Sequence, residues 1–404
     1  DVGVFTGDKR LVVRCNEQVV LHLDVDFLHH GRPQRELDAF MPKPPRTASA
    51  LIPEWLTATA PMKHLQRLLA HPNIASKESI IHRYDHEIRG ATVVRPLVGV
   101  ENDGHGDGVV LAEPTDQHGI AIGIGVNPWF GLVDPQRMAE AVVDEAMRNV
   151  VAVGADPTQV ALLDNFSWGD PTRPSTLGEL VAAVDGCARA AKTFGAPFVS
   201  GKDSLNNEFQ GSDGQRHAVP PTLVITAVAH VPDVVLTVTS DLKSAGNILM
   251  LIGTTHNEFG GSHVAMIHGA LRTGVVPKFD PRAPERYQTM HAAITHGLIV
   301  SCHDCSEGGL AVALAEMAIA GRLGVQCVSS DVFGDNELSV DLFSESLGRF
   351  VIEVTPSHVN AITQLFPDSS RVIGHVTSEP IFILPDGSRA SIADLRECWQ
   401  GTPG

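Results

Sequence analysis

Glu145 and Asn149 are the first residues that could do chemistry, because they lie four positions apart on an apolar helical stripe. That spacing puts both on one helix face, so we expect both side chains to point inward. A buried carboxylate is costly unless it is paired or bound to a metal. Two interpretations stay open. One is a salt bridge to an interior arginine, either Arg95 or a neighbour of Arg148. The other is a pair of oxygen ligands for Mg2+, which takes carboxylate and amide oxygens.

The segment His303–Gly309 (HDCSEGG) lies between an apolar strand and an Ala/Leu-rich helix. A strand, a glycine-rich turn and a helix in succession present free N–H groups at the helix start, which suits an anion. Asp304 is of a type that can hold a metal bridging to a phosphate, and Ser306 can donate a hydrogen bond. The alternative is that Asp304 or Ser306 simply caps the helix.

Two glycine-containing loops add polar candidates. The run Ser200–Ser204 (SGKDS) leaves an apolar strand and suits phosphate contact, although it lacks the GxxxxGK[ST] spacing of a P-loop. The run Asn102–Gly108 (NDGHGDG) precedes an apolar strand and is either a metal-ligand loop or a plain turn. No nucleophilic Ser/His/Asp or Cys/His arrangement can be picked out by spacing in the sequence.

Strands and helices must position these residues, and their alternation predicts an α/β (α+β) layered fold. Periodicity, caps and turn residues predict the following elements before residue 233: a hairpin around Asn16-Glu17, a Pro-rich link at Pro42–Pro53, helical spacing over Trp55–Ala70, a strand at Gly119–Val126 with one fully buried face, a helix from Asp134-Pro135 to about Gly154, a helix after a capping box at Thr176–Glu179, a loop at Val199–Phe209 and a strand at Thr222–Val231.

The same signals predict a second block from residue 233 onward. Its expected elements are a strand at Asn247–Gly253, a helix around Pro284–His296, a strand at Leu298–Cys302, a helix at Gly309–Ala320, a strand at Gly348–Val354 and a closing strand near Ile381–Leu384. We therefore expect four parts: residues 1–45, a linker and helix at 46–79, and domains at 80–232 and 233–404.

Bulk composition excludes several classes of protein. The chain has 404 residues, more than one core usually holds, so two or more domains are expected. A formal net charge of −17 argues against nucleic-acid and membrane partners. No apolar run approaches the roughly 20 residues of a membrane span. The six cysteines are scattered, with one isolated CxxC at Cys302 and Cys305, and fit the reduced thiols of a cytoplasmic protein rather than zinc.

Several segments, taken together and in order, resemble the second repeat of phosphoribosylformylglycinamidine synthases. They are Tyr84–Gly90 (YDHEIRG), Asp134-Pro135 leading to Glu145–Asn149 (EAMRN), Leu162–Pro171 (LLDNFSWGDP), Ser200–Glu208 (SGKDSLNNE), Gly260–Ser262 (GGS), His303–Leu310 and Leu342–Phe350 (LFSESLGRF). The resemblance extends from about residue 80 to 385, and residues 1–45 resemble the closing hairpin of a preceding repeat.

This resemblance implies a fold and an activity. The fold is an aminoimidazole ribonucleotide synthetase-like repeat, with an N-terminal sheet domain that forms a barrel with a second copy and a C-terminal α/β sandwich domain. The activity is a ligase reaction of purine synthesis: ATP phosphorylates the amide oxygen of formylglycinamide ribonucleotide, and glutamine-derived ammonia displaces the phosphate. The implied partners are an N-terminal synthetase repeat, in the same or a separate chain, a glutaminase domain or subunit, and the small-molecule substrate.

The resemblance also implies roles for single residues. Asp164 and Gly201 match contacts to the catalytic ATP, and Ser204 matches a substrate contact. Lys202 replaces an asparagine that binds Mg2+ in small members of the family, so we expect it to meet a phosphate directly. The second cleft is expected to hold ADP or ATP with Mg2+. Its matching metal ligands are Asp107, Glu145, Asn149 and Asp304, and Gly106 and Ser306 match positions beside its nucleotide.

Nothing in the sequence matches the catalytic histidine or the Ser-His-Asn-His segment of the family's first repeat, so the chain alone is expected to be an incomplete enzyme. The alternative is a catalytically silent, nucleotide-binding half that scaffolds the ligase. A homodimeric aminoimidazole ribonucleotide synthetase is a third hypothesis, and the DNFSWGDP and SGKDSLNNEF runs argue against it.

Overall fold

A computed structural model of the chain describes residues 2–43, 52–84, 87–113, 115, 117–272, 274–334 and 336–401. Pro44 and Pro45 of the expected link, and Asp85 and His86 of the YDHEIRG segment, lie outside these residues. The chain divides into a hairpin unit, up to residue 38, and a main unit from residue 39 onward. Of the helices described, none is both long and apolar enough to cross a membrane.

The hairpin unit pairs β1 (Arg10–Cys15) with β2 (Gln18–Asp24) in antiparallel fashion and ends in the short helix α1 (Val25–His30). Asn16 and Glu17 form the turn with φ of 47° and 64°. Two successive positive φ values match the right-handed twist of a two-residue hairpin. The expected hairpin around these two residues is confirmed.

The main unit begins with three helices, α2 (Glu54–Thr57), α3 (Pro61–Leu69) and α4 (Glu78–Ile81). The helical stretch predicted over Trp55–Ala70 is therefore broken into two. Pro61 occupies the first turn of α3, where a missing N–H has no cost, but its ring cannot continue a helix that began earlier.

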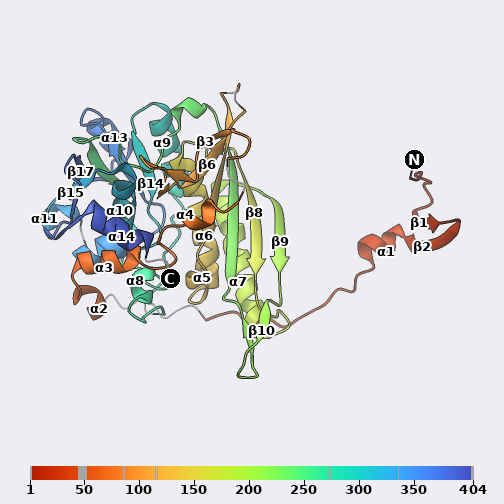
Figure 1. The fold of residues 1–404 in the computed structure, drawn as a ribbon. Helices are drawn as coiled ribbons and strands as arrows, with labels where there is room; N and C mark the ends of the chain where they lie inside the picture. The colour runs from red at the N-terminus through yellow and green to blue at the C-terminus, as the bar shows by residue number, and fades with distance from the viewer. Residues whose placement is uncertain are drawn as a thin grey trace. The chain divides into compact units, whose positions relative to one another are not determined.

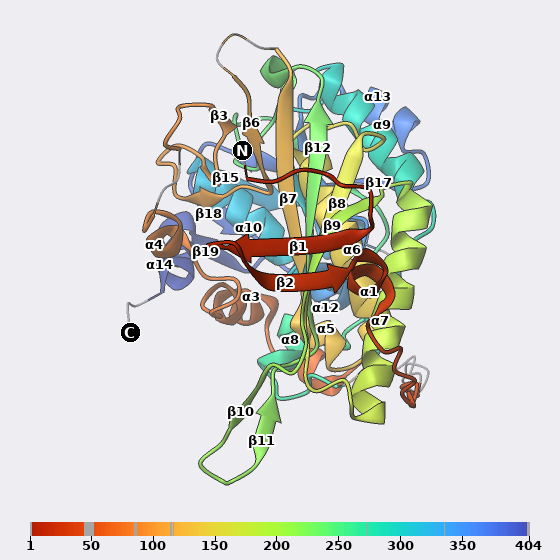
Figure 2. The same cartoon turned by 90° about the vertical axis from the view of Figure 1, so that its right-hand side faces the viewer.

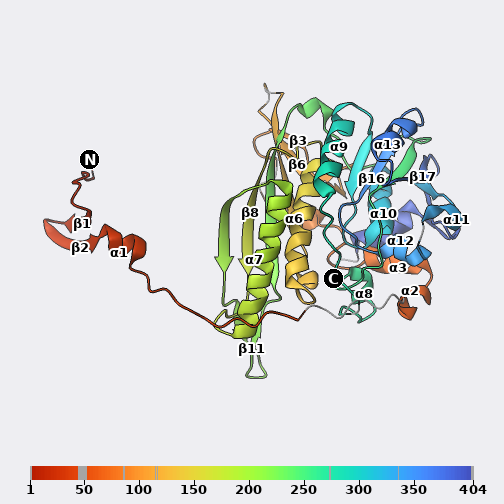
Figure 3. The same cartoon turned by 180° about the vertical axis from the view of Figure 1, so that it is seen from behind.

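Among the described residues, the first sheet has six strands in the order β3-β6-β7-β12-β8-β9. Only the β8–β9 pair among these strands is parallel. Figures 1 and 3 show α6 and α7 on the same face of this sheet. The elements of this block are β3 (Thr92–Val94), β4 (Leu97–Val98), β5 (Gly104–His105), β6 (Gly108–Leu111), β7 (Gly119–Val126), α5 (Pro128–Gly131), α6 (Pro135–Ala152), β8 (Val160–Ser167), α7 (Pro174–Phe194), β9 (Phe198–Ser204), β10 (Glu208–Gln210), β11 (Arg216–Ala218), β12 (Thr222–Val231) and the 3-10 turn η1 (Val234–Leu236).

Strand β7 has one buried face, as expected, and that face carries its small residues. A Cβ added to Gly125 would collide with the carbonyl oxygen of Val142 in α6. Only glycine therefore allows the helix to lie so close. The isoleucines point the other way, and Ile120 and Ile124 are 51% and 49% exposed. Figure 2 shows β7, β12, β8 and β9 in the view turned toward this sheet.

Capping residues in the sequence predicted the start of α6 correctly and the start of α7 incorrectly. Asp134 caps α6 by accepting a hydrogen bond from the Arg137 backbone N–H at 3.1 Å, as predicted. The capping box at Thr176–Glu179 is wrong, because α7 begins earlier, with Pro174 in its first turn.

The loop expected at Val199–Phe209 is also wrong. Most of it is strand β9, which pairs in parallel with β8. β9 is an edge strand, held by backbone hydrogen bonds to one neighbour, and most of its side chains are exposed. Its sequence therefore lacks the alternation of apolar and polar residues by which a strand is predicted.

The second sheet has, among the described residues, seven strands in the order β14-β16-β13-β17-β15-β18-β19. The strand predicted at Leu298–Cys302 begins later, at Ser301, because Leu298 belongs to the turn after α9. The predicted last strand does not close the block, since β19 and α14 follow it. The elements are β13 (Ile248–Ile252), α8 (His263–Met266), α9 (Ala283–Thr295), β14 (Ser301–Asp304), α10 (Gly309–Gly321), β15 (Gly324–Cys327), α11 (Ser330–Phe333), α12 (Leu338–Phe343), β16 (Phe350–Val354), α13 (Val359–Leu365), β17 (Ser370–Thr377), β18 (Ile381–Ile383), β19 (Arg389–Ser391) and α14 (Ile392–Gln400).

The architecture is thus mixed α/β, as predicted. Neither sheet closes into a barrel within the part of the chain that the structure describes. Buried apolar residues of α6, α9 and β16 belong to one continuous core, so the two blocks of the main unit are packed together.

Candidate functional site

A cavity of about 170 Å³ lies where the first block of the main unit meets the second. Residues from the two glycine-rich segments and from α6 line it. The site residues predicted from the sequence that it brings together are Gly106, Asp107, Asn149, Asp304 and Ser306. Four ionisable residues without a sequence-based assignment also line it, namely His105, His303, Glu307 and Glu316.

Asp107 has one oxygen fixed and one left over. Its Oδ1 lies 2.7 Å from His303 Nδ1 and accepts a hydrogen bond from the Asp304 backbone N–H at 3.1 Å. Its Oδ2 is buried and has no hydrogen-bond partner among the described residues. A buried, unpaired carboxylate oxygen is unfavourable by itself. It is therefore suited to a cation.

His303 stands between two carboxylates, since its Nε2 lies 3.2 Å from Glu316 Oε2. Burial alone would lower the pKa of His303, but Asp107 and Glu316 together raise it well above its ordinary value. A protonated imidazole donates from both nitrogens, which holds Asp107 and Glu316 in place. His303 thus acts on Asp107 in the same way that a neighbouring group orients a metal ligand.

Asp304 is oriented by an arginine. Nε of Arg148 lies 3.3 Å from Asp304 Oδ2, while Oδ1 accepts from the Ser306 hydroxyl at 3.4 Å. Arg148 also pairs with Asp144, one turn earlier in α6. Burial raises the pKa of Asp304 to about 7 even though Arg148 opposes the shift. Asp107 and Asp304 therefore each have one oxygen bound to a cationic side chain, His303 for Asp107 and Arg148 for Asp304.

Glu145 and Asn149 both contact the backbone of β7. Glu145 Oε2 accepts from the Val126 N–H at 3.0 Å, and Asn149 Nδ2 donates to the Ile124 carbonyl at 2.7 Å. Asn149 is buried as predicted, whereas Glu145 is half-buried and lies beside the cavity rather than in its lining.

The salt bridge considered for Glu145 is not formed within the described residues. Arg148 pairs with Asp144 and Asp304, and Arg95 lies 3.1 Å from Glu87. Loss of water raises the pKa of Glu145 well above its ordinary value, and the neighbouring carboxylates of Glu307 and Asp304 add to the shift.

The ligand atoms of Asp107, His303 and Asp304 all lie within 4.8 Å of one another. The raised pKa of Asp304 and the unpaired Oδ2 of Asp107 both favour a cation between these groups, because it stabilises the charged carboxylates. Carboxylate and amide oxygens are the donors that Mg2+ prefers. The residues present fit Mg2+, with Asp107 and Asp304 as the central oxygen ligands.

The start of α10 differs from both expectations. Neither Asp304 nor Ser306 caps the helix; its cap is Gly308, with φ of 78° and no capping side chain. The Gly308 N–H donates to Glu345 Oε1 at 2.8 Å, so a carboxylate of this chain already occupies one of the N–H groups expected to meet an anion.

A second group of predicted residues lies apart from this cavity, on the paired strands β8 and β9. Asp164 is directly opposite Gly201, and a Cβ at residue 201 would crowd the Asp164 carboxylate. Lys202 Nζ donates to the Ser204 hydroxyl. Burial and the neighbouring Asp203 raise the pKa of Asp164. Because side chains alternate along a strand, Asp164 and Gly201 share one face of the sheet and Lys202 and Ser204 the other, so these residues do not form an enclosed site.

Two residues of the cavity, His303 and Glu316, were not predicted as site residues, because little in the sequence around them points to a shared site. His303 belongs to the His303–Gly309 segment, but nothing local shows that Asp107 lies beside it. Glu316 is the one charged residue within the apolar run Leu310–Ala320. A carboxylate in such a helix is a reason to look for a buried partner, and His303 is that partner.

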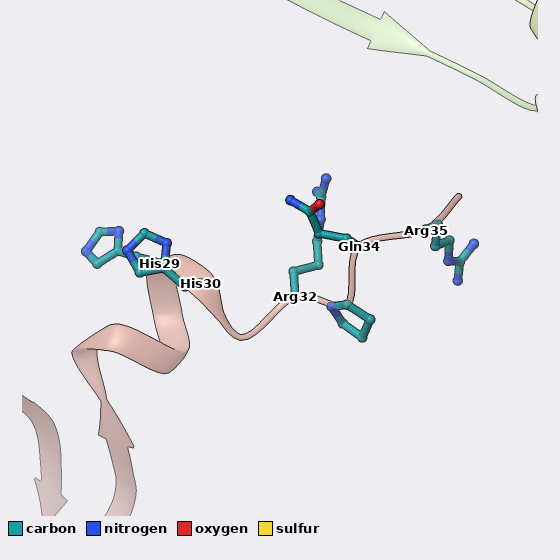
Figure 4. A pocket seen from close by; sticks show the side chains of 6 residues that line it. His29, His30, Arg32, Gln34 and Arg35 are labelled. Carbon is teal, nitrogen blue, oxygen red and sulfur yellow. The ribbon is translucent and has the colours of Figure 1, made fainter. Parts of the chain in front are cut away.

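The hairpin unit has a wider cavity of about 890 Å³, lined by His29, His30, Arg32, Pro33, Gln34 and Arg35. Figure 4 shows the two imidazoles at the end of α1 and the other side chains spread along the segment that follows. All six residues are exposed. This cavity has no converging, buried polar groups and shares no residue with the predicted site.

Comparisons with known proteins show what the chain is similar to. The family model described as AIR synthase related protein, N-terminal domain, matches residues 97–231, and the model for the C-terminal domain matches residues 244–386. The PurL subunit of phosphoribosylformylglycinamidine synthase from Thermococcus sibiricus is 33% identical over 402 residues, 98% of this chain and 52% of that protein. The PurL subunit from Alkaliphilus metalliredigens is 31% identical over 411 residues, 99% and 53% respectively.

The chain thus spans about half the length of the curated relatives it matches. Among solved structures, Thermotoga maritima PurL complexed with FGAR superposes with a TM-score of 0.64 at 17% identity, over 85% of this chain and 54% of that one. A likeness at this identity shows the fold.

Proposed function

This chain belongs to the family of AIR synthase related proteins, and from that premise we propose that it is the second repeat of a phosphoribosylformylglycinamidine synthase. The proposed reaction is the ATP-dependent conversion of formylglycinamide ribonucleotide to its amidine in purine synthesis, with ammonia derived from glutamine. Similarity to PurL subunits along almost the whole chain supports this proposal. The division into repeats gives four parts: residues 1–45, 46–79, 80–232 and 233–404.

The observation that carries the proposal is the paired orientation of Asp107 and Asp304 in the cavity. One oxygen of each carboxylate is bound by His303 or Arg148, and Oδ2 of Asp107 is left without a partner among the described residues. We propose that these aspartates, with Glu145 and Asn149, hold Mg2+, and that Gly106 and Ser306 lie beside ADP or ATP. Mg2+ supplies charge neutralisation for the phosphates when bound.

Asp164, Gly201, Lys202 and Ser204 are proposed to serve a different cleft, completed by the first repeat. Gly201 and Lys202 are exposed on β9, and half-buried Asp164 and Ser204 lie beside them on β8 and β9, so the group is open to a second domain. The Lys202 ammonium is suited to a phosphate, and Ser204 to a substrate oxygen or a phosphate. In phosphoryl transfer, such donors stabilise the charge that develops on the transferred oxygens.

The face of the first sheet opposite α6 is the proposed contact with the first repeat. Exposed Ile120 and Ile124 lie along β7, and Val93 of β3 is exposed as well. A second sheet of the same kind placed on this face gives a barrel and covers the apolar side chains. A glutaminase domain or subunit is the proposed ammonia source, and the cytoplasm is the proposed location.

A silent scaffold is the second candidate, and Glu345 favours it. Its carboxylate takes the Gly308 N–H, so one of the donors at the start of α10 is not available to a transferred phosphate. Under this proposal the cavity holds a nucleotide that is never turned over.

Amidine formation should be assayed with ATP, Mg2+, formylglycinamide ribonucleotide and ammonium for the purified chain alone and after addition of its first repeat. Activity only in the mixture supports a shared ligase. If Ser204→Ala is as active as the wild type in that mixture, this chain is a scaffold. A full-length PurL subunit is assayed in parallel as the positive control. If it is active while the mixture is inactive with both the wild-type chain and Ser204→Ala, the proposed reaction is wrong.

A further inference from the structure

The loop that carries Gly106 and Asp107 is fixed from outside the cavity by the C-terminal helix α14. Nε and NH2 of Arg396 lie 3.2 and 2.8 Å from Asp103 Oδ2. Asp103 precedes Asp107 by four residues, and its side chain is 4% exposed. A buried carboxylate held by a guanidinium at two nitrogens has little freedom to move.

A second arginine reaches the same carboxylate. Arg322 follows α10 and donates from NH2 to Asp103 Oδ2 at 2.5 Å. Both guanidinium groups also contact Glu101 Oε2, at 3.0 Å from Arg322 and 2.9 Å from Arg396. The loop is thus bound to the C-terminal end of α10 and to the middle of α14, two helices that pack against each other (Figure 1).

Trp399 makes a second contact between α14 and the loop. Its ring centroid lies 4.7 Å from that of His105, and Trp399 is almost fully buried. His105 lines the cavity, and its Nε2 accepts from the Lys77 backbone N–H at 2.9 Å. Residues 103 and 105 on the approach to Asp107 are therefore each held by a side chain of α14.

The loop has little other support from strand pairing. β5 contains Gly104 and His105 and pairs only with the two-residue β4 among the described strands. Gly104 packs directly on Ala320 of α10, where an added Cβ would collide with the alanine side chain. The loop therefore takes its position from α10 and α14 as far as His105, and Asp107 is followed directly by β6 of the first sheet.

We propose that Arg396 is a positioning residue for the metal site: it fixes Asp103 so that Asp107 presents its unpaired oxygen to the cavity. This inference rests on the proposed Mg2+ site for its functional meaning, but the positioning itself is a property of the metal-free chain. Groups that hydrogen-bond a metal ligand directly typically contribute about 10- to 100-fold in metal affinity, and Arg396 acts one step further away, through Asp103, so a smaller effect is expected.

The test compares Arg396→Ala with Arg396→Lys and with Arg389→Ala, which removes the same charge from an exposed site on β19. Two readouts are needed. Hydrogen–deuterium exchange of peptides covering residues 99–108 in the metal-free chain reports loop order. Titration with Mn2+ alone, followed by electron paramagnetic resonance, reports metal affinity.

We expect Arg396→Ala to speed exchange in this loop and to weaken Mn2+ binding by up to about 10-fold, the lower end of what direct partners of metal ligands contribute. Arg396→Lys should recover part of both effects, and Arg389→Ala should change neither. Unchanged exchange in Arg396→Ala overturns the inference, as does faster exchange with unchanged Mn2+ affinity. If the wild-type chain binds no Mn2+, the proposed metal site fails, and exchange still decides whether α14 holds the loop. Exchange of β12 peptides shows whether a variant has simply unfolded.

Discussion

Arg148 reaches from α6 to Asp304 at the end of β14, with Nε 3.3 Å from Oδ2. This contact joins the first block of the main unit to the second at the edge of the cavity. On the other side, Arg148 pairs with Asp144, which also accepts from the Tyr287 hydroxyl at 2.6 Å and the Gly348 N–H at 3.2 Å. The arginine therefore orients a proposed metal ligand and closes a fully buried polar network.

Replacing Arg148 with alanine should cost about 3–5 kcal/mol of unfolding free energy, because two buried carboxylates lose their cation. Urea unfolding measures this cost. Arg282→Ala is the control, since that side chain is 75% exposed and lies 3.6 Å from Asp280. An exposed pair contributes about 1 kcal/mol or less. Equal losses in the two variants would contradict the assignment.

Mg2+ with ADP should raise the melting temperature of the wild-type chain, and Asp107→Asn should remove most of that rise. At a ligand concentration 100 times Kd, binding stabilises a protein by about 2.7 kcal/mol. Glu145→Ala should behave like Asp107→Asn, and Asp164→Asn should keep the shift, because Asp164 lies on β8, outside the cavity. A shift that survives in EDTA, or in Asp107→Asn, shows that the metal ligands are wrongly assigned.

Ser204→Ala should lower turnover in the complete enzyme by about 10- to 100-fold, the usual worth of a hydrogen bond to a charged group. Any nucleotide that copurifies should stay bound, since Ser204 is on β9 and does not line the cavity. Turnover by steady-state assay and nucleotide content by absorbance after denaturation give the two numbers. Loss of the nucleotide with Ser204→Ala would place this serine at the wrong cleft.

Alone, the chain should form dimers or larger assemblies at micromolar concentration through the face of β7 that carries Ile120 and Ile124. Ile124→Asp should shift it toward monomer in sedimentation velocity, because a charge on a buried interface is strongly unfavourable. Val372→Asp is the control, on β17 of the other sheet, where Val372 is 37% exposed. A compact wild-type monomer would be the contrary result.

The ion pair between His263 and Glu345 should make a pH-dependent contribution to the free energy of unfolding. Nδ1 of His263 lies 3.1 Å from Glu345 Oε1, and both side chains are buried. Burial alone would lower the pKa of His263, but the Glu345 carboxylate raises it above its ordinary value. The pair therefore stabilises the fold fully below about pH 6.5, and this contribution is lost as pH rises through the folded-state pKa.

His263→Gln should accordingly cost most at pH 6 and less at pH 9 when unfolding free energies are measured in urea. His82→Gln is the matched control, because its pair with Glu78 is 46% and 40% exposed. A cost for His263→Gln that grows with pH would mean that the histidine is neutral in the folded protein.

The sequence predicted features that depend on neighbours along the chain. Asp134-Pro135 marks the start of α6, and the isoleucine alternation marks β7, because capping and strand periodicity are local properties. The direction in which β7 faces was less obvious, since burial there is decided by how closely α6 can approach Gly123 and Gly125. The isoleucines then stay outside, on the face where we propose that the first repeat packs.

The candidate site was predictable only in part, through the resemblance of short segments to a known family. Asp107 and Asp304 matched the family, and the structure brings them to one cavity. Their relation to His303, Arg148 and Arg396 joins residues far apart in sequence, and no spacing rule describes such contacts. The start of α10 was unpredictable for the same reason. The carboxylate that accepts the Gly308 N–H belongs to Glu345, which lies far along the chain on the loop after α12.

The contact between Arg396 and Asp103 spans 293 positions of the chain. On a ribosome adding about 5–20 residues per second, Asp103 emerges roughly 15 to 60 s before its partner. Until then, the loop before Asp107 lacks its contacts with α14, and long-range contacts of this kind form late because closing the intervening chain is entropically costly. A nascent chain therefore completes the described strands of both sheets before α14 can fix this loop, so the proposed metal site reaches its final geometry late.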